Sequence, residues 1–131
     1  RHPPFQQLNE IVVDADHPST TPLPKVWQWS DECYYVKEVN PDIHVLVVHD
    51  LSNIPDKNKP DFYGNVFPSV WCHEFDGGRQ WYTALGHEGK AYTDPVFKKH
   101  LLGGLQWVVS KRGKPDYSKA RAVSPDDKLP Y

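Results

Sequence analysis

The order of hydrophobic and polar residues predicts three β-strands in the middle of the chain. Residues 43–50, IHVLVVHD, form a nearly continuous apolar run, which is typical of a strand buried on both faces. Residues 69–75 and 79–86 alternate apolar with polar side chains. The Asp-Gly-Gly sequence at 76–78 favours a tight hairpin between them, because glycine tolerates positive φ. We expect residues 43–48 and both hairpin strands to lie in one sheet.

The pattern after this hairpin predicts a helix over residues 94–109. Thr93 or Asp94 can cap its first turn, and Pro95 suits the first helical position. Apolar residues then recur at helical spacing. The Gly-Gly pair at 103–104 lowers helix propensity by about 1 kcal/mol per residue relative to alanine. We therefore expect this part of the helix to pack closely against the sheet.

The remaining segments carry weaker signals. The β-branched residues in 10–13 predict a short strand, and hydroxyl side chains followed by prolines predict a single helical turn at 25–27. The polar loop at 51–66 is long enough to be a candidate lid or insertion. Residues 111–131 have the composition of a polar tail or linker. The folded domain is therefore assigned to residues 1–110.

Composition narrows the class of protein. The 131 residues carry a formal net charge of −2, so bulk charge favours neither nucleic acid nor an anionic membrane as a partner. No apolar run approaches the roughly 18 residues that span a bilayer. The chain opens on Arg-His-Pro-Pro, without an initiator methionine or a signal peptide, so we expect a processed or truncated product. The compartment stays open, with export favoured over the cytoplasm.

Histidines, acids and aromatic residues supply the candidate chemistry. His17 precedes a proline and His87 follows a glycine, and both lie where a predicted strand ends. The alternatives are a solvated loop for His17 and a hydrogen bond to a backbone carbonyl for His87. Trp29 belongs to an aromatic cluster around Asp31 and Glu32. Such a cluster suits sugar binding and an ordinary core equally well.

The two cysteines and the histidines leave metal and redox chemistry open. Cys33 and Cys72 can pair in an oxidising compartment or stay free, and they lack the spacing of a structural zinc site. Two histidines with a carboxylate can form a catalytic zinc site that keeps one position open for water. A divalent metal such as zinc, held by His17 and His87, is therefore a hypothesis that sequence spacing does not enforce.

Several motifs occur in a characteristic order. They are a proline-tryptophan strand, a Gly-Gly-Arg turn, an aromatic strand ending in Gly-His, a Tyr-x-Asp-Pro-x-Phe segment and a Leu-Leu-Gly-Gly-x-x-Trp helix. Their residues, with two motifs further upstream, are His17, Pro18, Leu23, Pro24, Asp31, Glu32, Tyr34 or Tyr35, Pro68, Trp71, Gly77, Gly78, Arg79, Tyr82, Gly86, His87, Tyr92, Asp94, Pro95, Phe97, Leu101, Gly103, Gly104 and Trp107. This set, spread over residues 5–110, resembles the ThuA-like (trehalose utilisation) family.

The resemblance implies an α/β fold like that of the class I glutamine amidotransferases. This fold is a three-layer, flavodoxin-like sandwich around a mostly parallel sheet. The first βα units of the family precede the stretch present here, so the chain resembles the C-terminal half to two-thirds of a ThuA-like domain, incomplete at the N-terminus. Parallel sheets are covered on both faces. We therefore expect the isolated protein to expose apolar surface and to need the missing N-terminal segment or another chain.

The resemblance also implies a role in the utilisation of a trehalose-type sugar, with hydrolase and isomerase chemistry both open. Glutamine hydrolysis is excluded, because neither cysteine lies in a Gly-x-Cys-x-Gly elbow. His87 is expected to act as acid/base or metal ligand, with Glu32 as its acidic partner. Arg79, Trp29 and Tyr82 are expected to contact the substrate. A non-catalytic carbohydrate-binding or scaffolding module is the alternative.

These roles require that the residues meet in one polar pocket. We expect His87 and Glu32 to share it, with Arg79 at its rim and His17 close enough to join. For Arg79 the alternative is a salt bridge that fixes the hairpin to the acidic residues 31–32.

Overall fold

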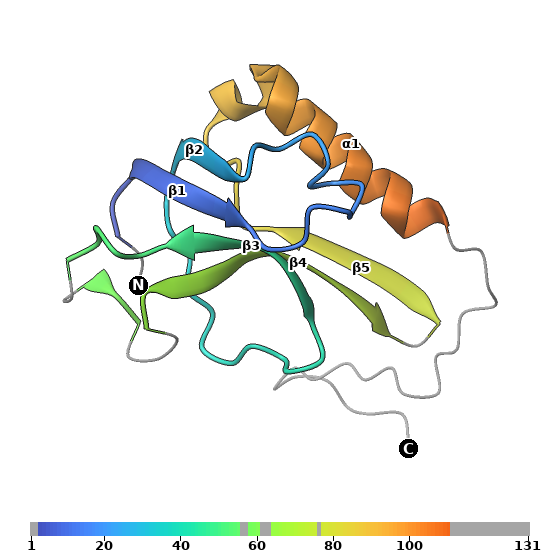
Figure 1. Ribbon diagram of the computed structural model, residues 1–131, viewed down its shortest axis with the longest axis horizontal. Helices are drawn as coiled ribbons and strands as arrows, with labels where there is room; N and C mark the ends of the chain where they lie inside the picture. Colours follow the sequence, from blue (N-terminus) through green and yellow to red (C-terminus); the bar gives the residue numbers. More distant parts are fainter. Residues whose placement is uncertain (1–2, 56–57, 61–63, 76, 111–131) are drawn as a thin grey trace, which may run out of the picture.

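The computed structural model describes residues 3–55, 58–60, 64–75 and 77–110. Within these ranges five strands form one sheet in the order β2-β1-β3-β4-β5, and every neighbouring pair is antiparallel. A short 3₁₀ helix, η2, precedes a single α-helix, α1, which lies along one side of the sheet (Figure 1). The elements are β1 (Gln6–Val12), β2 (Val26–Asp31), β3 (His44–Asp50), β4 (Val66–Phe75), β5 (Gly78–Thr83), η2 (Gly89–Thr93) and α1 (Pro95–Ser110).

The expected three-layer sandwich with a mostly parallel sheet is wrong for this chain. A parallel pair needs a crossover of about a dozen residues or more, usually a helix. Here Phe75 at the end of β4 pairs with Gly78 at the start of β5, and residues 32–43 between β2 and β3 contain no helix. Within the described residues the sheet is curled and antiparallel, with one helical layer. The predicted tail, residues 111–131, lies outside the described residues.

The predicted hairpin and its helix are confirmed. β3, β4 and β5 are neighbours in the sheet, and α1 contacts β5. The Gly-Gly pair of α1 lies against its neighbours as expected. A Cβ added to Gly104 would come within 2.3 Å of the Trp81 ring, and one added to Gly103 within 2.1 Å of the Pro18 carbonyl oxygen. These two positions therefore accept only glycine without movement of the packed atoms.

The helical turn predicted at 25–27 is wrong, because this segment begins β2. Trp27 and Trp29 point to one face of the sheet and pair with Glu10 and Leu8 of β1. β1 itself begins earlier than the predicted strand at 10–13. Pairing between two distant segments thus overrides the local helix-start signals of the intervening prolines.

The core lies mainly between the sheet and α1. Its largest cluster joins Val12 of β1, Val47 of β3 and Val70 of β4 to Phe97 of α1. A second cluster extends the same face beneath the loops at the far end of the sheet. Its buried members are Leu8, Cys33, Leu51, Ile54 and Phe67.

The other face of the sheet carries apolar side chains that remain accessible. Val26, Ile11 and Val48 follow one another in register across β2, β1 and β3. Val26 is 51% exposed, whereas Val12, which points to the opposite face, is 1% exposed. The helices of the described residues are too short or too polar to cross a membrane.

Candidate functional site

The buried Asp31 carboxylate holds the turn that follows β5. Its Oδ2 accepts hydrogen bonds from the Gly86 backbone N–H at 2.6 Å and the Trp29 Nε1–H at 2.8 Å. Its Oδ1 accepts from the backbone N–H of Glu32 at 2.9 Å and of His87 at 3.3 Å. The end of β2 and the exit of β5 are thereby joined through one side chain. Gly86 has φ of +100°, which favours glycine at this turn.

This arrangement brings His87 next to Glu32. The His87 Nδ1 lies 3.6 Å from the Glu32 Oε2, and the Tyr34 hydroxyl lies between the two side chains. That hydroxyl is hydrogen-bonded to Glu32 and lies 3.0 Å from His87 Nδ1. The hydrogen bond to Glu32 is the main cause that raises the pKa of Tyr34 to about 12. The prediction that His87 and Glu32 lie together is confirmed, while their catalytic roles stay predictions.

Trp71 and Tyr82 form an aromatic pair across the neighbouring strands β4 and β5. Tyr82 is 39% exposed and stacks on Trp71, with ring centroids 4.1 Å apart. Its charge contributes to the raised pKa of Tyr34, less than the hydrogen bond from Tyr34 to Glu32. Burial raises the pKa of Tyr82 itself. Tyr82 therefore offers a partly exposed ring, as a substrate-contacting residue would.

A cavity of about 600 Å³ lies on the other side of Asp31, between β2 and η2. Trp29 lines it and also stacks on Phe97 at 5.0 Å, so this ring serves both the cavity and the core. Acidic, basic and aromatic side chains thus surround one space next to the turn that carries His87. The lining includes Trp27, Trp29, Asp31, Glu88, Lys90 and Asp94.

The prediction that Arg79 lies at the rim of the His87 site is wrong. Arg79 binds Glu74 at 2.9 Å and stacks over the Trp107 ring at 4.5 Å, near the C-terminal end of α1. His87 instead precedes the N-terminal end of this helix. At 1.5 Å per residue, Pro95 and Trp107 are roughly 18 Å apart along the axis. The alternative, a salt bridge to residues 31–32, is wrong for the same reason.

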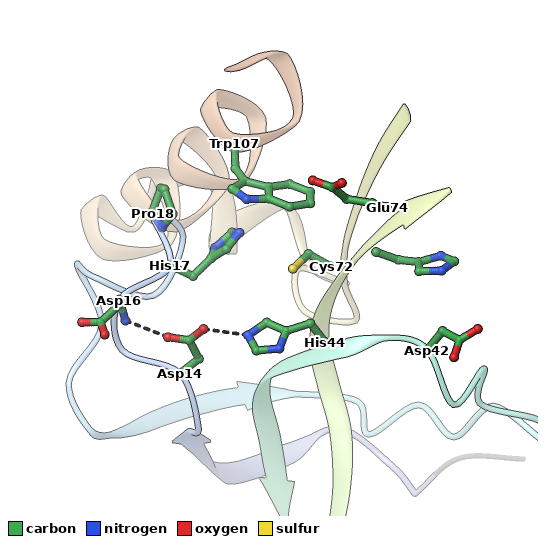
Figure 2. A pocket seen from close by; sticks show the side chains of 10 residues that line it. Asp14, Asp16, His17, Pro18, Asp42, His44, Cys72, Glu74 and Trp107 are labelled. Carbon is green, nitrogen blue, oxygen red and sulfur yellow. Dashed lines mark hydrogen bonds and ion pairs between the residues drawn. The ribbon is translucent and has the colours of Figure 1, made fainter. Parts of the chain in front are cut away.

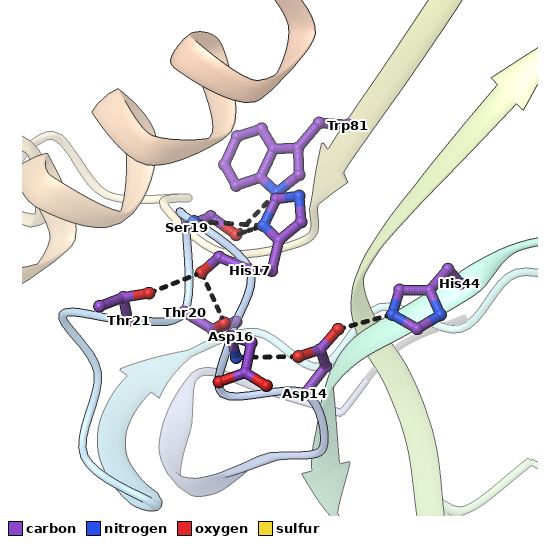
Figure 3. A network of polar contacts seen from close by, with 8 residues as sticks. All are labelled: Asp14, Asp16, His17, Ser19, Thr20, Thr21, His44 and Trp81. Atoms are coloured by element: carbon purple, nitrogen blue, oxygen red, sulfur yellow. Dashed lines mark hydrogen bonds and ion pairs between the residues drawn. The ribbon is translucent and has the colours of Figure 1, made fainter. Parts of the chain in front are cut away.

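His17 also lies at this distant end, and it is a buried residue. Figure 3 shows its ring against Ser19, in a network that extends to Trp81. The Ser19 backbone N–H donates to His17 Nδ1 at 3.2 Å, and the Ser19 hydroxyl lies 2.8 Å from the same atom. Burial lowers the pKa of His17, which is 6% exposed and stacks 5.2 Å from Trp107. The prediction that His17 lies close to His87 is therefore wrong, and so is the alternative that His17 lies in a solvated loop.

A second cavity, of about 450 Å³, opens beside His17 (Figure 2). His44 is hydrogen-bonded there to Asp14 at 2.7 Å, and Cys72 and Trp107 also line the space. Within the described ranges, three or more His, Cys, Asp or Glu side chains nowhere converge as a metal site requires. The zinc site expected from His17 and His87 is thus not formed in this part of the chain. Both cysteines are buried free thiols.

Sequence reasoning missed two residues of the site. The sequence pattern assigns no role to Tyr34 or Asp31, yet the Tyr34 hydroxyl contacts His87 Nδ1 and the Asp31 carboxylate accepts a hydrogen bond from the His87 backbone N–H. A sequence signal for Asp31 exists, because Trp27, Trp29 and Asp31 alternate along β2 and so lie on the same face of the sheet. The two tryptophans indicate that the Asp31 carboxylate points to the core side.

Comparison with known proteins assigns the chain to a family. The family model described as ThuA, trehalose utilisation, matches residues 1–108. The chain belongs to this family. A ThuA-like protein from Bacteroides uniformis ATCC 8492 is 26% identical, with a TM-score of 0.65 over 86% of this chain and 47% of its own. A ThuA-like protein from Parabacteroides merdae ATCC 43184 shares the fold at 23% identity, with a TM-score of 0.61 over 90% of this chain and 46% of its own.

The ThuA-family chain therefore spans about half the length of these two solved relatives. No curated protein matches it significantly.

Proposed function

We propose that this ThuA-family chain acts on a trehalose-type sugar, with His87 as general acid or base and Glu32 as its acidic partner. The observation that carries the proposal is the contact among His87, Tyr34 and Glu32 next to an aromatic and acidic cavity. Family membership supports the sugar, since the family is described by trehalose utilisation.

The chemistry of the surrounding residues suits a sugar. Carboxylates accept hydrogen bonds from hydroxyl groups, and aromatic faces pack against the C–H surface of a sugar ring. Trp29 and Tyr82 are the proposed aromatic contacts. The His87 side chain is 50% exposed, so a substrate oxygen can reach the imidazole. Proton transfer to or from that oxygen serves hydrolysis as well as isomerisation.

The donor set around His87 does not fit the expected zinc site. His87 and Glu32 supply two ligand side chains, and the described residues bring no third His, Cys, Asp or Glu into a metal-binding arrangement with them. A catalytic zinc ion uses three protein ligands. The proposed mechanism therefore uses protein side chains alone.

The test compares His87→Ala with His44→Ala on trehalose as the substrate. His44 is a matched control, because its side chain is 61% exposed and lies with Asp14 at the other end of the sheet. General acid–base catalysis contributes about 10²- to 10⁴-fold. We expect His87→Ala to lose turnover by that factor while it retains most of its affinity, and His44→Ala to keep both.

Two other outcomes decide against this mechanism. If the protein binds trehalose without converting it, and His87→Ala binds equally well, the non-catalytic carbohydrate-binding module is the better description. If equilibrium titration monitored by tryptophan fluorescence shows neither binding nor turnover, both functions are refuted.

We further propose that the open face of the sheet is covered in the assembled protein, by further ThuA-like sequence or by another chain. Val26 is 51% and Val66 42% exposed on this face, and the solved relatives are about twice as long. Exposed apolar surface of this kind marks an interaction site. A monodisperse monomer that melts cooperatively, measured by sedimentation and calorimetry on the 131-residue protein, would contradict this proposal.

A further inference from the structure

The Tyr34 hydroxyl lies between two groups with different hydrogen-bonding capacities. An ionised carboxylate only accepts hydrogen bonds, whereas a tyrosine hydroxyl has one proton to donate and lone pairs that accept. The contact between Tyr34 and Glu32 therefore uses the tyrosine proton. The oxygen of Tyr34 is left with lone pairs alone for its second contact, at 3.0 Å from His87 Nδ1. That contact is a hydrogen bond only if Nδ1 carries a proton.

We propose that Tyr34 is a positioning residue that fixes the proton of neutral His87 on Nδ1 and so leaves Nε2 as the reacting atom. The hydrogen bonds then run from His87 Nδ1–H to the Tyr34 oxygen, and from the Tyr34 hydroxyl to Glu32. Nε2 keeps a free lone pair, which takes a proton from a substrate hydroxyl. Only this last step rests on the proposed function.

The remaining contacts of His87 agree with this assignment. Within the described ranges the ring bonds through Nδ1, and Nε2 has no protein hydrogen-bond partner. The direct distance of 3.6 Å from Nδ1 to Glu32 is longer than a hydrogen bond, so the carboxylate acts through Tyr34. Asp31 holds the His87 backbone at 3.3 Å. Backbone and ring are thus fixed independently, by Asp31 and by Tyr34.

This role extends the function of Glu32. A carboxylate that orients a histidine and selects its tautomer is known from the serine protease triad, where the wrong tautomer lowers kcat by about 10⁴-fold. Here a tyrosine is inserted between the carboxylate and the imidazole. We therefore expect Tyr34→Phe to lower kcat on trehalose by between about 10-fold and 10⁴-fold with little change in KM.

The decisive experiment is NMR of the imidazole nitrogens in ¹⁵N-histidine-labelled protein, at a pH where His87 is neutral and without any substrate. In the natural protein we expect a protonated Nδ1 and an unprotonated Nε2. Tyr34→Phe removes the acceptor, so the two tautomers should mix and both nitrogen shifts should move toward each other. Tyr92→Phe is the matched control, because this 53% exposed tyrosine lies near Gly86 without contacting His87, and it should leave the shifts unchanged.

Each result separates this inference from the proposed function. A proton on Nε2 of His87 in the natural protein, or unchanged nitrogen shifts in Tyr34→Phe, would overturn the role of Tyr34 whatever the activity. The expected tautomer in a protein that does not convert trehalose would support the role of Tyr34 while refuting catalysis on that sugar.

Discussion

The buried pair of Glu10 and His49 should make the stability of the protein fall in alkaline solution. These residues are register partners on β1 and β3, both are fully buried, and His49 Nδ1 lies 2.5 Å from Glu10 Oε1. Ser69 donates a hydrogen bond to the other Glu10 oxygen at 2.7 Å. Burial of the imidazole by itself lowers its pKa, but Glu10 and the neighbouring Cys33 outweigh this and raise the pKa of His49 to about 10.

The direction and size of the effect follow from proton linkage. Between about pH 6.5 and 10, the folded protein keeps a proton on His49 that the unfolded chain has already released. The contribution of His49 is therefore complete below about pH 6.5 and is lost as the pH rises toward 10. Each pH unit in this window lowers the free energy of unfolding by about 1.4 kcal/mol. A rise from about pH 6.5 to 9 should remove about 3 kcal/mol.

The perturbation is a double variant, Glu10→Gln with His49→Gln, which removes both charges and keeps groups that can hydrogen-bond. We expect its free energy of unfolding, from urea denaturation followed by tryptophan fluorescence, to decline about 3 kcal/mol less than that of the natural protein over this range. Glu10→Gln alone leaves an unpaired buried imidazole and should cost about 3–5 kcal/mol near neutral pH. The linkage argument fails if the natural protein and the double variant lose equal stability between about pH 6.5 and 9.

Three further predictions concern packing, the turn and acid stability. Gly104→Ala should destabilise the fold by about 1–3 kcal/mol, because the added Cβ would overlap the Trp81 ring. Gly89→Ala is the control: a Cβ added at Gly89 has no atom within 4 Å, so this variant should be close to neutral in the same urea experiment. Asp31→Ala should cost at least about 2 kcal/mol and speed hydrogen exchange of the Gly86 amide, because it leaves the partly buried N–H groups of Gly86 and Trp29 without their acceptor. Asp42→Ala on the surface is the control, and equal protection of the Gly86 amide in both variants would contradict this prediction. Burial lowers the pKa of His100 to about 4, so on acidification the unfolded chain binds a proton at this histidine before the folded protein does. The free energy of unfolding should therefore fall from about pH 6.5 toward pH 4. A His100→Gln variant whose melting temperature falls equally over this pH range would refute the assignment to His100.

Local patterns were sufficient for the elements whose partners are close in sequence. The hairpin of β4 and β5 follows from alternation around Asp-Gly-Gly, and the start of α1 follows from Asp94 and Pro95. The proximity of His87 and Glu32 was also predictable, because each residue follows the end of a segment that must return to the sheet. The family could be recognised in the same way, since its motifs are ordered along the chain.

Strand direction and long-range partners were decided by the tertiary structure alone. An apolar run such as β3 can occur in a parallel or in an antiparallel sheet. The residues of β3 alone therefore do not determine its antiparallel pairing with β1 and β4. Arg79 carries a charge that suits several carboxylates. The register of the β4–β5 hairpin places it opposite Glu74, and the position of α1 places the Trp107 ring against its guanidinium, far from Glu32. Likewise, Glu10 and His49 are 39 residues apart, and their ion pair exists because strand register places them opposite each other in a core that excludes water.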